Sequence, residues 1–290
     1  MGLKIFINGE FVDKEDAKVS VFDHGLLYGD GVFEGIRSYD RRVFRLDEHL
    51  DRLYTGASAI RLEVPMGKKD LEAKILEALN INGLDDAYIR VVVTRGEGDL
   101  GLDPRKCPKG NVFIIADKIA LYPGEFYENG LEIITAKTRR NPPDALNPRV
   151  KSLNYLNNIL GKIEAIDSGV PEALMLTMDG YVAECTGDNV FLVKDGRMAT
   201  PPVDIGALEG ITQNAVIELA GKRGIECARE KFKPEKIYDV DECFLTGTAA
   251  EIIPVVKLDG KTIGTGKPGE ITKLLLGDYR ELIKADGMVY

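Results

Sequence analysis

The chain has 290 residues, of which 44% are hydrophobic and 29% are charged, and its formal net charge at pH 7 is -9. These values are typical of a soluble globular protein with two domains or one large domain. The acidic balance argues against nucleic acid or an anionic membrane surface as the main partner. An anionic ligand would therefore need local Arg, Lys or backbone N–H groups.

Targeting and redox signals are sparse. No apolar run is long enough to span a bilayer, and the N-terminus predicts a strand rather than a signal peptide. The four cysteines form no C-x-x-C pair, so we expect a reducing, cytoplasmic setting. His24 and His49 are too few for a His-rich metal site, and we expect no metal. Gln213 is the only glutamine, which would suit a thermophile, and a melting temperature in the mesophile range would contradict that.

The first 120 residues predict a small α+β unit. Residues 5–12 predict a hairpin, because Asn8-Gly9 is the preferred two-residue turn. Asp47 is the expected N-cap of a helix whose apolar residues recur at helical spacing up to Ile60. The other elements expected in this unit are a helix over residues 70–79 and strands over 88–94 and 111–115.

Residues 121–130 are expected to form an interdomain linker, with Tyr122-Pro-Gly124 as its breaker. The second unit, residues 131–290, is predicted to be the larger one. It combines many hairpins with few helices, which favours an antiparallel sheet or barrel over a doubly wound sheet. Asp-Gly hairpin turns are expected at 179, 195 and 259, and helices over 153–167, 212–223 and 270–285.

Two residues in distinctive local sequences suggest the chemistry. Lys151 lies in Arg149-Val-Lys-Ser-Leu-Asn-Tyr155, and Glu184 lies in Tyr181-Val-Ala-Glu-Cys-Thr-Gly-Asp-Asn-Val-Phe191. An amine can form an imine and a carboxylate can hold a protonated pyridine, and both belong in a pyridoxal phosphate site. Taken singly, each is more often a solvated surface group. Lys137, in a predicted strand, and Lys162, on a predicted helix, lack such a motif.

Two glycine-containing stretches could bind an anion. Gly210-Ile-Thr212 precedes a predicted helix, whose free N–H groups and dipole attract phosphate. In Thr246-Gly-Thr-Ala-Ala250 the glycine permits close backbone approach, and Thr248 can donate to an anion. In isolation, an ordinary N-cap and a bend after a strand are the better interpretations of the two stretches.

The first unit offers three further candidates. Arg52 lies at the margin of the core-facing side of the first predicted helix, where most arginines are surface residues. The stretch Tyr28-Gly-Asp-Gly-Val-Phe-Glu-Gly-Ile-Arg37 predicts a compact strand and turn, with a glycine-rich hairpin as the plain alternative. Tyr88 and Arg90 share one strand face by period-2 alternation, and a polar outer face would explain them equally well.

Together these motifs resemble the fold-type IV pyridoxal phosphate enzymes, and within them the branched-chain amino acid aminotransferases. The resemblance extends from Phe6-Ile-Asn-Gly9 to Thr246-Gly-Thr-Ala-Ala-Glu-Ile252. It implies an α+β fold with a small N-terminal α/β domain, a short linker and a larger C-terminal pseudo-barrel domain that binds pyridoxal 5'-phosphate. It also implies a homodimer or higher homo-oligomer with active sites near the subunit interface.

The resemblance assigns roles at the cofactor. Lys151 would hold the cofactor as an imine and serve as general base and then general acid. Tyr155 would hydrogen-bond the ring hydroxyl, Glu184 would pair with the pyridine nitrogen, and Arg52 would bind the phosphate. The remaining cofactor-binding residues implied are Leu208, which would pack on the ring, and Gly210, Ile211, Thr212, Gly247 and Thr248.

The implied reaction moves the amino group of L-leucine, L-isoleucine or L-valine to 2-oxoglutarate with ping-pong kinetics. One pocket must then accept an aliphatic side chain, with apolar surface from Phe33, and the side-chain carboxylate of glutamate, near Tyr28 and Arg90. The substrate-binding residues implied are Tyr28, Phe33, Gly35, Arg37, Tyr88, Arg90, Leu102, Tyr122, Thr248 and Ala249.

D-amino acid and (R)-amine transaminases of the same fold are the alternatives. The D-enzymes lack the Glu-Gly-Ile-Arg run and place an Arg-x-His trap where this chain has Gly96-Glu-Gly-Asp-Leu-Gly-Leu-Asp103, without histidine. The (R)-amine enzymes usually alter positions 37 and 90, and the related lyases lack Tyr88-x-Arg90. The loop around Leu102 departs from the best-known bacterial sequences. A non-catalytic cofactor carrier would leave its cofactor unchanged when L-leucine is added.

Overall fold

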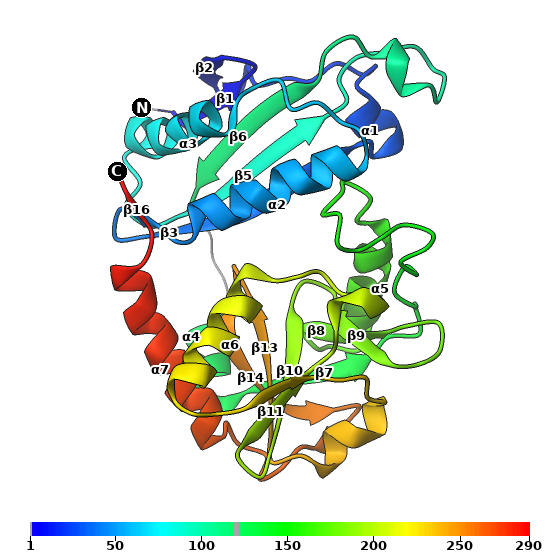
Figure 1. The fold of residues 1–290 in the computed structure, drawn as a ribbon, viewed down its shortest axis with the longest axis vertical. Coiled ribbons are helices and arrows are strands. Elements are labelled where there is room, and N and C mark those ends of the chain that lie inside the picture. The colour runs from blue at the N-terminus through cyan, green and yellow to red at the C-terminus, as the bar shows by residue number, and fades with distance from the viewer. Residues whose placement is uncertain (1, 119–121) are drawn as a thin grey trace. The chain divides into compact units, whose positions relative to one another are not determined.

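The computed structural model describes residues 2–118 and 122–290, which form two compact units (Figure 1). The first unit runs through residue 118 and includes residues 150–154 and 283–290, and the second contains 122–149 and 155–282. Within the described ranges, no helix has the length and apolar character needed to cross a membrane. The expected α+β fold with two parts is confirmed, whereas the domain boundaries near 120 and 130 stay predictions.

The first unit is an antiparallel sheet with helices packed on it. Its elements are β1 (Lys4–Ile7), β2 (Glu10–Asp13), α1 (His24–Tyr28), β3 (Gly31–Tyr39), β4 (Arg42–Val43), α2 (Leu46–Ala59), α3 (Lys68–Asn82), β5 (Ala87–Thr94), a 3-10 helix (Pro104–Lys106), β6 (Asn111–Asp117) and β16 (Met288–Val289). The strand order is β16-β4-β3-β5-β6-β1-β2. Helices α2 and α3 pack against β3 and β6, and Leu50 and Ile75 are fully buried there.

The hairpin predicted at the N-terminus is confirmed. β1 and β2 pair antiparallel with Ile5 opposite Val12. Asn8 and Gly9 both have positive φ, 50° and 109°, which asparagine and glycine tolerate best.

Helix α2 begins before the predicted N-cap, so the assignment of Asp47 to that position is wrong. Arg45 holds the N-cap position in a left-handed conformation, with φ 50° and ψ 41°. The chain must turn sharply there because β4 ends only at Val43, and a 2.5 Å bond from Arg45 Nε to Asp286 holds the turn. Asp47 lies instead in the first helical turn, where a carboxylate favours the helix dipole.

The second unit is built on a curled, half-barrel sheet. Its elements are α4 (Gly124–Asn129), β7 (Leu131–Thr135), α5 (Leu156–Asp167), β8 (Glu172–Leu176), β9 (Val182–Cys185), β10 (Asn189–Lys194), β11 (Arg197–Thr200), a 3-10 helix (Val203–Ile205), α6 (Ile211–Lys222), β12 (Cys227–Arg229), a 3-10 helix (Pro234–Asp239), β13 (Glu242–Gly247), β14 (Glu251–Leu258), β15 (Lys261–Thr262) and α7 (Glu270–Ala285). The order is β12-β11-β10-β13-β14-β7-β8-β9, with β15 beside β14.

This sheet is mixed rather than wholly antiparallel. β7 runs parallel to both of its neighbours, β14 and β8, and β12 runs parallel to β11. The three predicted Asp-Gly turns are confirmed, because they join β8 to β9, β10 to β11 and β14 to β15. Asp195 and Asp259 have the positive φ that such two-residue turns need.

Two expectations about local structure are wrong. The helix after Lys151 begins at Leu156 rather than Leu153, because Lys151 and Leu153 hydrogen-bond to β3 instead. Residues 121–130 include helix α4, with Pro123 as its N-cap; Leu121 lies outside the described residues, and the role of this segment as a linker stays a prediction. Lys137 follows β7, which ends at Thr135, and is not in a strand.

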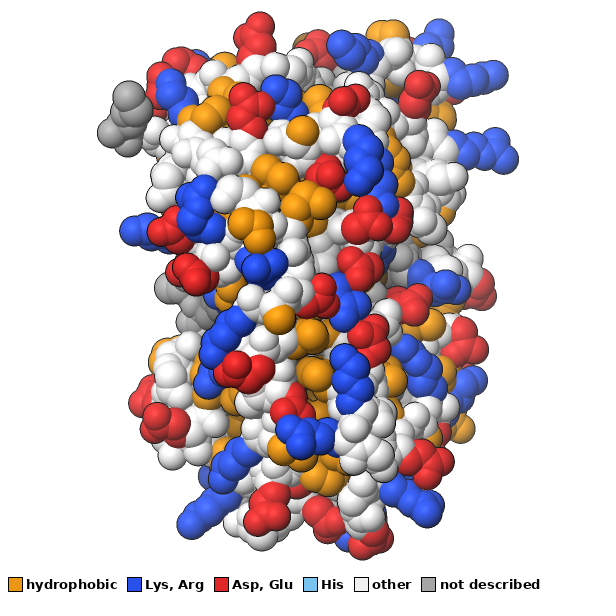
Figure 2. Space-filling model, turned by 60° about the vertical axis from the view of Figure 1, so that its left-hand side comes forward, with side chains coloured by type: hydrophobic (Ala, Val, Ile, Leu, Met, Phe, Trp, Pro, Cys, Tyr) orange, Lys and Arg blue, Asp and Glu red, His pale blue; other side chains and the backbone are white. Residues whose placement is uncertain are grey.

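Charge is mixed over the surface drawn in Figure 2. Basic and acidic side chains alternate over this face without a broad patch of one sign. On this face, the net charge of -9 is therefore spread out rather than concentrated.

Candidate functional site

Lys151 lies in the first unit, on a short segment that pairs with the start of β3. The Phe33 N–H donates to the Lys151 carbonyl at 2.9 Å, and the Leu153 N–H donates to the Gly31 carbonyl at 3.0 Å. This pairing places the Lys151 ammonium 4.7 Å from the centre of the Phe33 ring. The predicted imine-forming amine is thus held against a buried aromatic side chain.

Tyr88 and Arg90 lie on one face of β5, as the alternation predicted. Arg90 Nη2 donates to the Tyr88 hydroxyl at 3.0 Å, and the guanidinium lies 4.5 Å from the centre of the Phe33 ring. On β3, Gly35 is opposite Arg90 and Arg37 is opposite Tyr88. The structure therefore gathers an aromatic ring, a phenol, a guanidinium and Lys151 beside the first half of β3.

Arg52 is held in a buried polar cluster with Glu34 and His49. Its Nε and Nη2 donate to the two Glu34 oxygens at 2.7 and 2.9 Å, and His49 Nδ1 lies 2.8 Å from Glu34 Oε2. Burial alone would raise the pKa of Glu34, but Arg52 and His49 together hold it well below its usual range. Burial lowers the pKa of His49.

The sequence reasoning missed that Glu34 accepts from Arg52 and that His49 contacts the same carboxylate. Two signals were available. His49 precedes Arg52 by three positions on a helix, which places the two on one side, and Glu34 lies in a strand that is buried at every position except Arg37. A buried carboxylate requires a charged partner.

Tyr28 is the last residue of α1 rather than part of a strand, and the chain turns at Gly29 in a left-handed conformation. Its hydroxyl donates to the Leu100 carbonyl at 2.6 Å, and its ring meets His24 edge-on at 5.0 Å. Leu102 follows in the same loop and is 79% exposed. The structure thus connects Tyr28 to the loop that carries Leu102.

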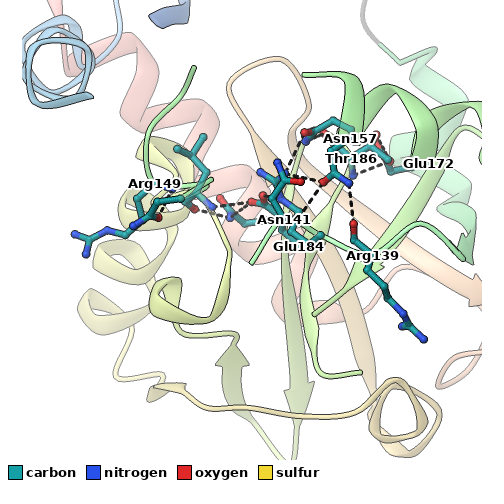
Figure 3. A network of polar contacts seen from close by, with 12 residues as sticks. Arg139, Asn141, Arg149, Asn157, Glu172, Glu184 and Thr186 are labelled. Atoms are coloured by element: carbon teal, nitrogen blue, oxygen red, sulfur yellow. Dashed lines mark hydrogen bonds and ion pairs between the residues drawn. The ribbon is translucent and has the colours of Figure 1, made fainter. Parts of the chain in front are cut away.

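Glu184 lies on β9 in the second unit and is only 5% exposed (Figure 3). Arg140 Nε donates to Glu184 Oε1 at 2.8 Å, and the Leu208 N–H donates to Oε2 at 2.9 Å. The predicted residues Glu184 and Leu208 are therefore brought together, through the Leu208 backbone. Arg140 was missed, because no motif distinguishes it from its neighbour Arg139.

Helix α6 starts three residues beyond Leu208, with Gly210 as its N-cap and Ile211 and Thr212 as its first residues. The first N–H groups of a helix have no carbonyl partner within it and carry the positive end of the dipole. A Cβ at Gly210 would collide with the Asn189 side chain, whose amide donates to the Leu208 carbonyl at 2.9 Å. The backbone of Leu208 therefore connects the Glu184 carboxylate with the residues at the start of α6.

The remaining predicted residues of the second unit lie at the end of β13, in the turn that follows it, and near the ends of helices. A Cβ at Gly247 would collide with Asp188, so the glycine permits close approach at the end of β13. Thr248 and Ala249 follow in the turn to β14. Burial raises the pKa of Tyr122 well above its ordinary value. Tyr155 is the half-buried N-cap of α5.

One buried hydroxyl beside this turn stands out. Thr246 is 1% exposed, and its Oγ1 has no hydrogen-bond partner among the residues that the structure describes. β13 pairs with β10 there, with Thr246 opposite Asn189. The polar groups of the second unit, a helix start with hydroxyls nearby and a buried carboxylate, suit a group with a phosphate and a proton-bearing nitrogen.

Comparison with known proteins gives a consistent result. The pattern of the family described as amino-transferase class IV matches residues 31–258. A Methanocaldococcus jannaschii protein is 54% identical over 280 residues, which cover 97% of this chain and 96% of that protein. The solved Escherichia coli branched-chain amino acid aminotransferase superposes with a TM-score of 0.95 at 37% identity, covering 99% of this chain and 97% of the other.

A further solved structure is the branched-chain amino acid aminotransferase from Thermobaculum terrenum in its pyridoxal phosphate form. It superposes with a TM-score of 0.87 at 31% identity and covers 97% of this chain and 94% of the other. Both structural similarities extend over nearly the whole chain. The resemblance first drawn from the motifs is therefore confirmed.

Proposed function

The chain belongs to the class IV aminotransferase family, and from that premise we propose that it is a pyridoxal phosphate-dependent branched-chain amino acid aminotransferase. It would move the amino group of L-leucine, L-isoleucine or L-valine to 2-oxoglutarate by a ping-pong mechanism. The relatives named as branched-chain aminotransferases support this choice.

One observation carries the proposal: the Lys151 amine and the Arg90 guanidinium lie over the same Phe33 ring, at 4.7 and 4.5 Å from its centre. An apolar ring favours an aliphatic side chain, and a guanidinium with a phenol beside it favours a carboxylate. A transaminase for branched-chain amino acids and glutamate needs both surfaces near its reactive amine.

The residues present fit pyridoxal phosphate. Glu184 accepts from Arg140 and Leu208, both donors, which favours the carboxylate form that a proton-bearing pyridine nitrogen requires. The start of α6, with Gly210, Ile211 and Thr212, suits the phosphate. We assign Arg52 to the phosphate and Tyr155 to the ring hydroxyl, as the resemblance implies. The remaining assignments, to Gly247, Thr248, Ala249, Arg37, Tyr28, Leu102 and Tyr122, rest on the resemblance alone.

The protein supplies the proton movements. When bound, the cofactor would serve as the electron sink for the charge left by removal of the α-proton. Lys151 Nζ would take that proton as general base and return it as general acid. Tyr88 and Arg90 would hold the distal carboxylate of glutamate, and Phe33 would pack against the aliphatic side chain and exclude water from it.

We also infer that the protein is a homo-oligomer, because α5 has an unusual distribution of side chains. Its buried residues are Asn158, Gly161 and Ala165, which are polar or small. Its large apolar residues are instead 45 to 66% exposed. They are Leu156, Ile159, Leu160, Ile163 and Ile166. An apolar stripe of this kind is typical of a surface covered by another protein chain.

The substrate assay compares L-leucine, D-alanine and a chiral (R)-amine, each with 2-oxoglutarate. We expect L-leucine to be turned over and the cofactor absorption to shift when L-leucine is added. Turnover of D-alanine without turnover of L-leucine would assign the protein to the D-amino acid enzymes. A spectrum that L-leucine leaves unchanged would indicate a cofactor carrier.

The assignment of Lys151 has its own test. Lys151→Ala should abolish transamination while the circular dichroism spectrum stays that of the folded protein. The matched controls Lys137→Ala and Lys162→Ala should retain turnover, since neither lysine lies on the segment paired with β3. Near-normal turnover by Lys151→Ala would show that another lysine reacts.

A further inference from the structure

Arg140 is a buried arginine whose side chain reaches Glu184. It is 5% exposed, and its Nε lies 2.8 Å from Glu184 Oε1. Its backbone N–H donates to the carbonyl of Leu176 at 2.9 Å, at the end of β8, the strand that pairs with β9. The guanidinium and the carboxylate are thus carried by adjacent parts of one sheet.

Two asparagines hold the other side of the guanidinium. Arg140 Nη1 donates to Oδ1 of Asn157 and to Oδ1 of Asn158, each at 3.1 Å. The amide nitrogens of the asparagines donate in turn to the carbonyls of Arg139 at 2.7 Å and Thr186 at 2.8 Å. These bonds fix which amide atom faces Arg140, so the guanidinium is oriented by neutral acceptors as well as by Glu184.

The second Glu184 oxygen accepts the Leu208 N–H at 2.9 Å, and the Asn189 amide approaches it at 3.4 Å. Each of these partners is a donor, as Arg140 is. Donors and an adjacent cation favour the charged form of a carboxyl group, and burial without them would favour the neutral form.

We propose that Arg140 is a positioning residue for transamination, which keeps Glu184 ionised and aimed so that it can hold a proton-bearing ring nitrogen of the cofactor. The proposal rests on the proposed function, because pyridoxal phosphate supplies that nitrogen. Arg140 acts through Glu184, and the asparagine pair fixes the direction of its guanidinium.

The test compares Arg140→Gln with Arg139→Gln. Both remove one positive charge at adjacent positions, but the Arg139 side chain is exposed and points away from the network, which it joins only through its carbonyl. The readouts are affinity of the cofactor-stripped full chain for pyridoxal phosphate, and kcat with L-leucine and 2-oxoglutarate across pH.

We expect Arg140→Gln to weaken cofactor binding and to lower kcat near neutral pH, each by about 10- to 100-fold, the range seen when a group that orients a metal ligand is lost. The loss of kcat should shrink as pH rises, because a higher pH restores the carboxylate. Arg139→Gln should stay within about two-fold of the unaltered protein, since it removes no bond to Glu184.

Two outcomes would overturn the proposal. In one, Arg140→Gln matches Arg139→Gln in both readouts. In the other, Arg140→Gln lowers the melting temperature and reduces kcat equally at every pH, while its affinity for the cofactor is unchanged. That result would show that Arg140 has a structural role only.

If Arg140→Gln does not fold, Arg140→Lys tests the positioning role instead, because lysine keeps the charge but not the planar guanidinium. Weaker cofactor binding or an altered pH profile in that variant supports the positioning role, and wild-type behaviour in both overturns it. Failure of the unaltered protein to bind pyridoxal phosphate would instead count against the proposed function itself.

Discussion

Gly35 leaves the space that the Tyr88 hydroxyl occupies: a Cβ added at Gly35 would collide with that oxygen. The same hydroxyl accepts the hydrogen bond from Arg90 Nη2 at 3.0 Å. A glycine on one strand therefore sets the position of a phenol and a guanidinium on the next.

Gly35→Ala should displace Tyr88 and with it Arg90. We expect an overpacking cost of about 1–3 kcal/mol in the free energy of unfolding. We also expect a loss of kcat/KM that is larger for L-glutamate than for L-leucine, because Arg90 is assigned to the distal carboxylate that only glutamate has. Steady-state kinetics with both substrates and a urea titration measure the two effects.

The control is Gly221→Ala, since a Cβ at this helical position meets no atom within 4 Å among the described residues. It should leave both substrates unaffected and raise stability slightly, because alanine is the better helix former. Equal losses of kcat/KM for the two substrates in Gly35→Ala would contradict the assignment of Arg90.

The Glu34, His49 and Arg52 cluster predicts how stability depends on pH. The pKa of Glu34 and that of His49 are both lowered in the folded protein. As pH falls, the unfolded chain therefore takes up protons that the folded protein does not. The free energy of unfolding should decrease through the ordinary histidine value of 6.5 and again through the ordinary glutamate value of 4.5.

Glu34→Gln should remove the second decrease, and at neutral pH it should cost about 3–5 kcal/mol, because the mostly buried Arg52 loses its anion. Urea titrations at a series of pH values measure both effects. The control is Glu77→Gln, which breaks the exposed pair with Lys74 and should cost at most about 0.5 kcal/mol. An equal cost in the two variants, or an unchanged acid slope in Glu34→Gln, would refute this account.

Because the apolar face of α5 is exposed, we expect charged residues placed on it to weaken the association of subunits. Ile159→Asp combined with Ile163→Asp should lower the molecular mass in solution to a smaller oligomer or a monomer, because buried, unpaired carboxylates would oppose association. Light scattering after size-exclusion chromatography measures this. Met178→Asp, at a residue 66% exposed in the β8–β9 turn, serves as the control and should keep the mass of the unaltered protein. If the double variant also keeps that mass, this face does not hold the subunits together.

The sequence predicted what depends on local geometry. Asn8-Gly9 and the Asp-Gly pairs were sufficient to predict their hairpins, because the tolerance of positive φ depends on the type of the residue itself. The shared face of Tyr88 and Arg90 followed from strand alternation. α7 spans the predicted residues, Glu270–Ala285, because its apolar residues recur at helical spacing.

What the sequence could not predict depends on distant partners. Leu153 was the predicted start of a helix, but its pairing with β3 takes precedence over that local preference. Asp47 is a good N-cap by type, yet the tight turn from β4 gives the position to Arg45. Glu34 lies on another element than Arg52, and Arg140 lies outside the strand of Glu184, so the fold determines that these side chains meet.

The interleaving of the two units constrains how the protein can be made. The first sheet gains its edge strand β16 from the far end of the chain, and the Ser38 hydroxyl meets the Tyr290 hydroxyl at 2.7 Å across 252 positions. The segment that carries Lys151 also reaches β3 only after more than a hundred intervening residues. During synthesis, the first sheet must therefore wait for Lys151 until residues 122–149 have been made, and for its edge strand until the ribosome has produced the whole of the second unit.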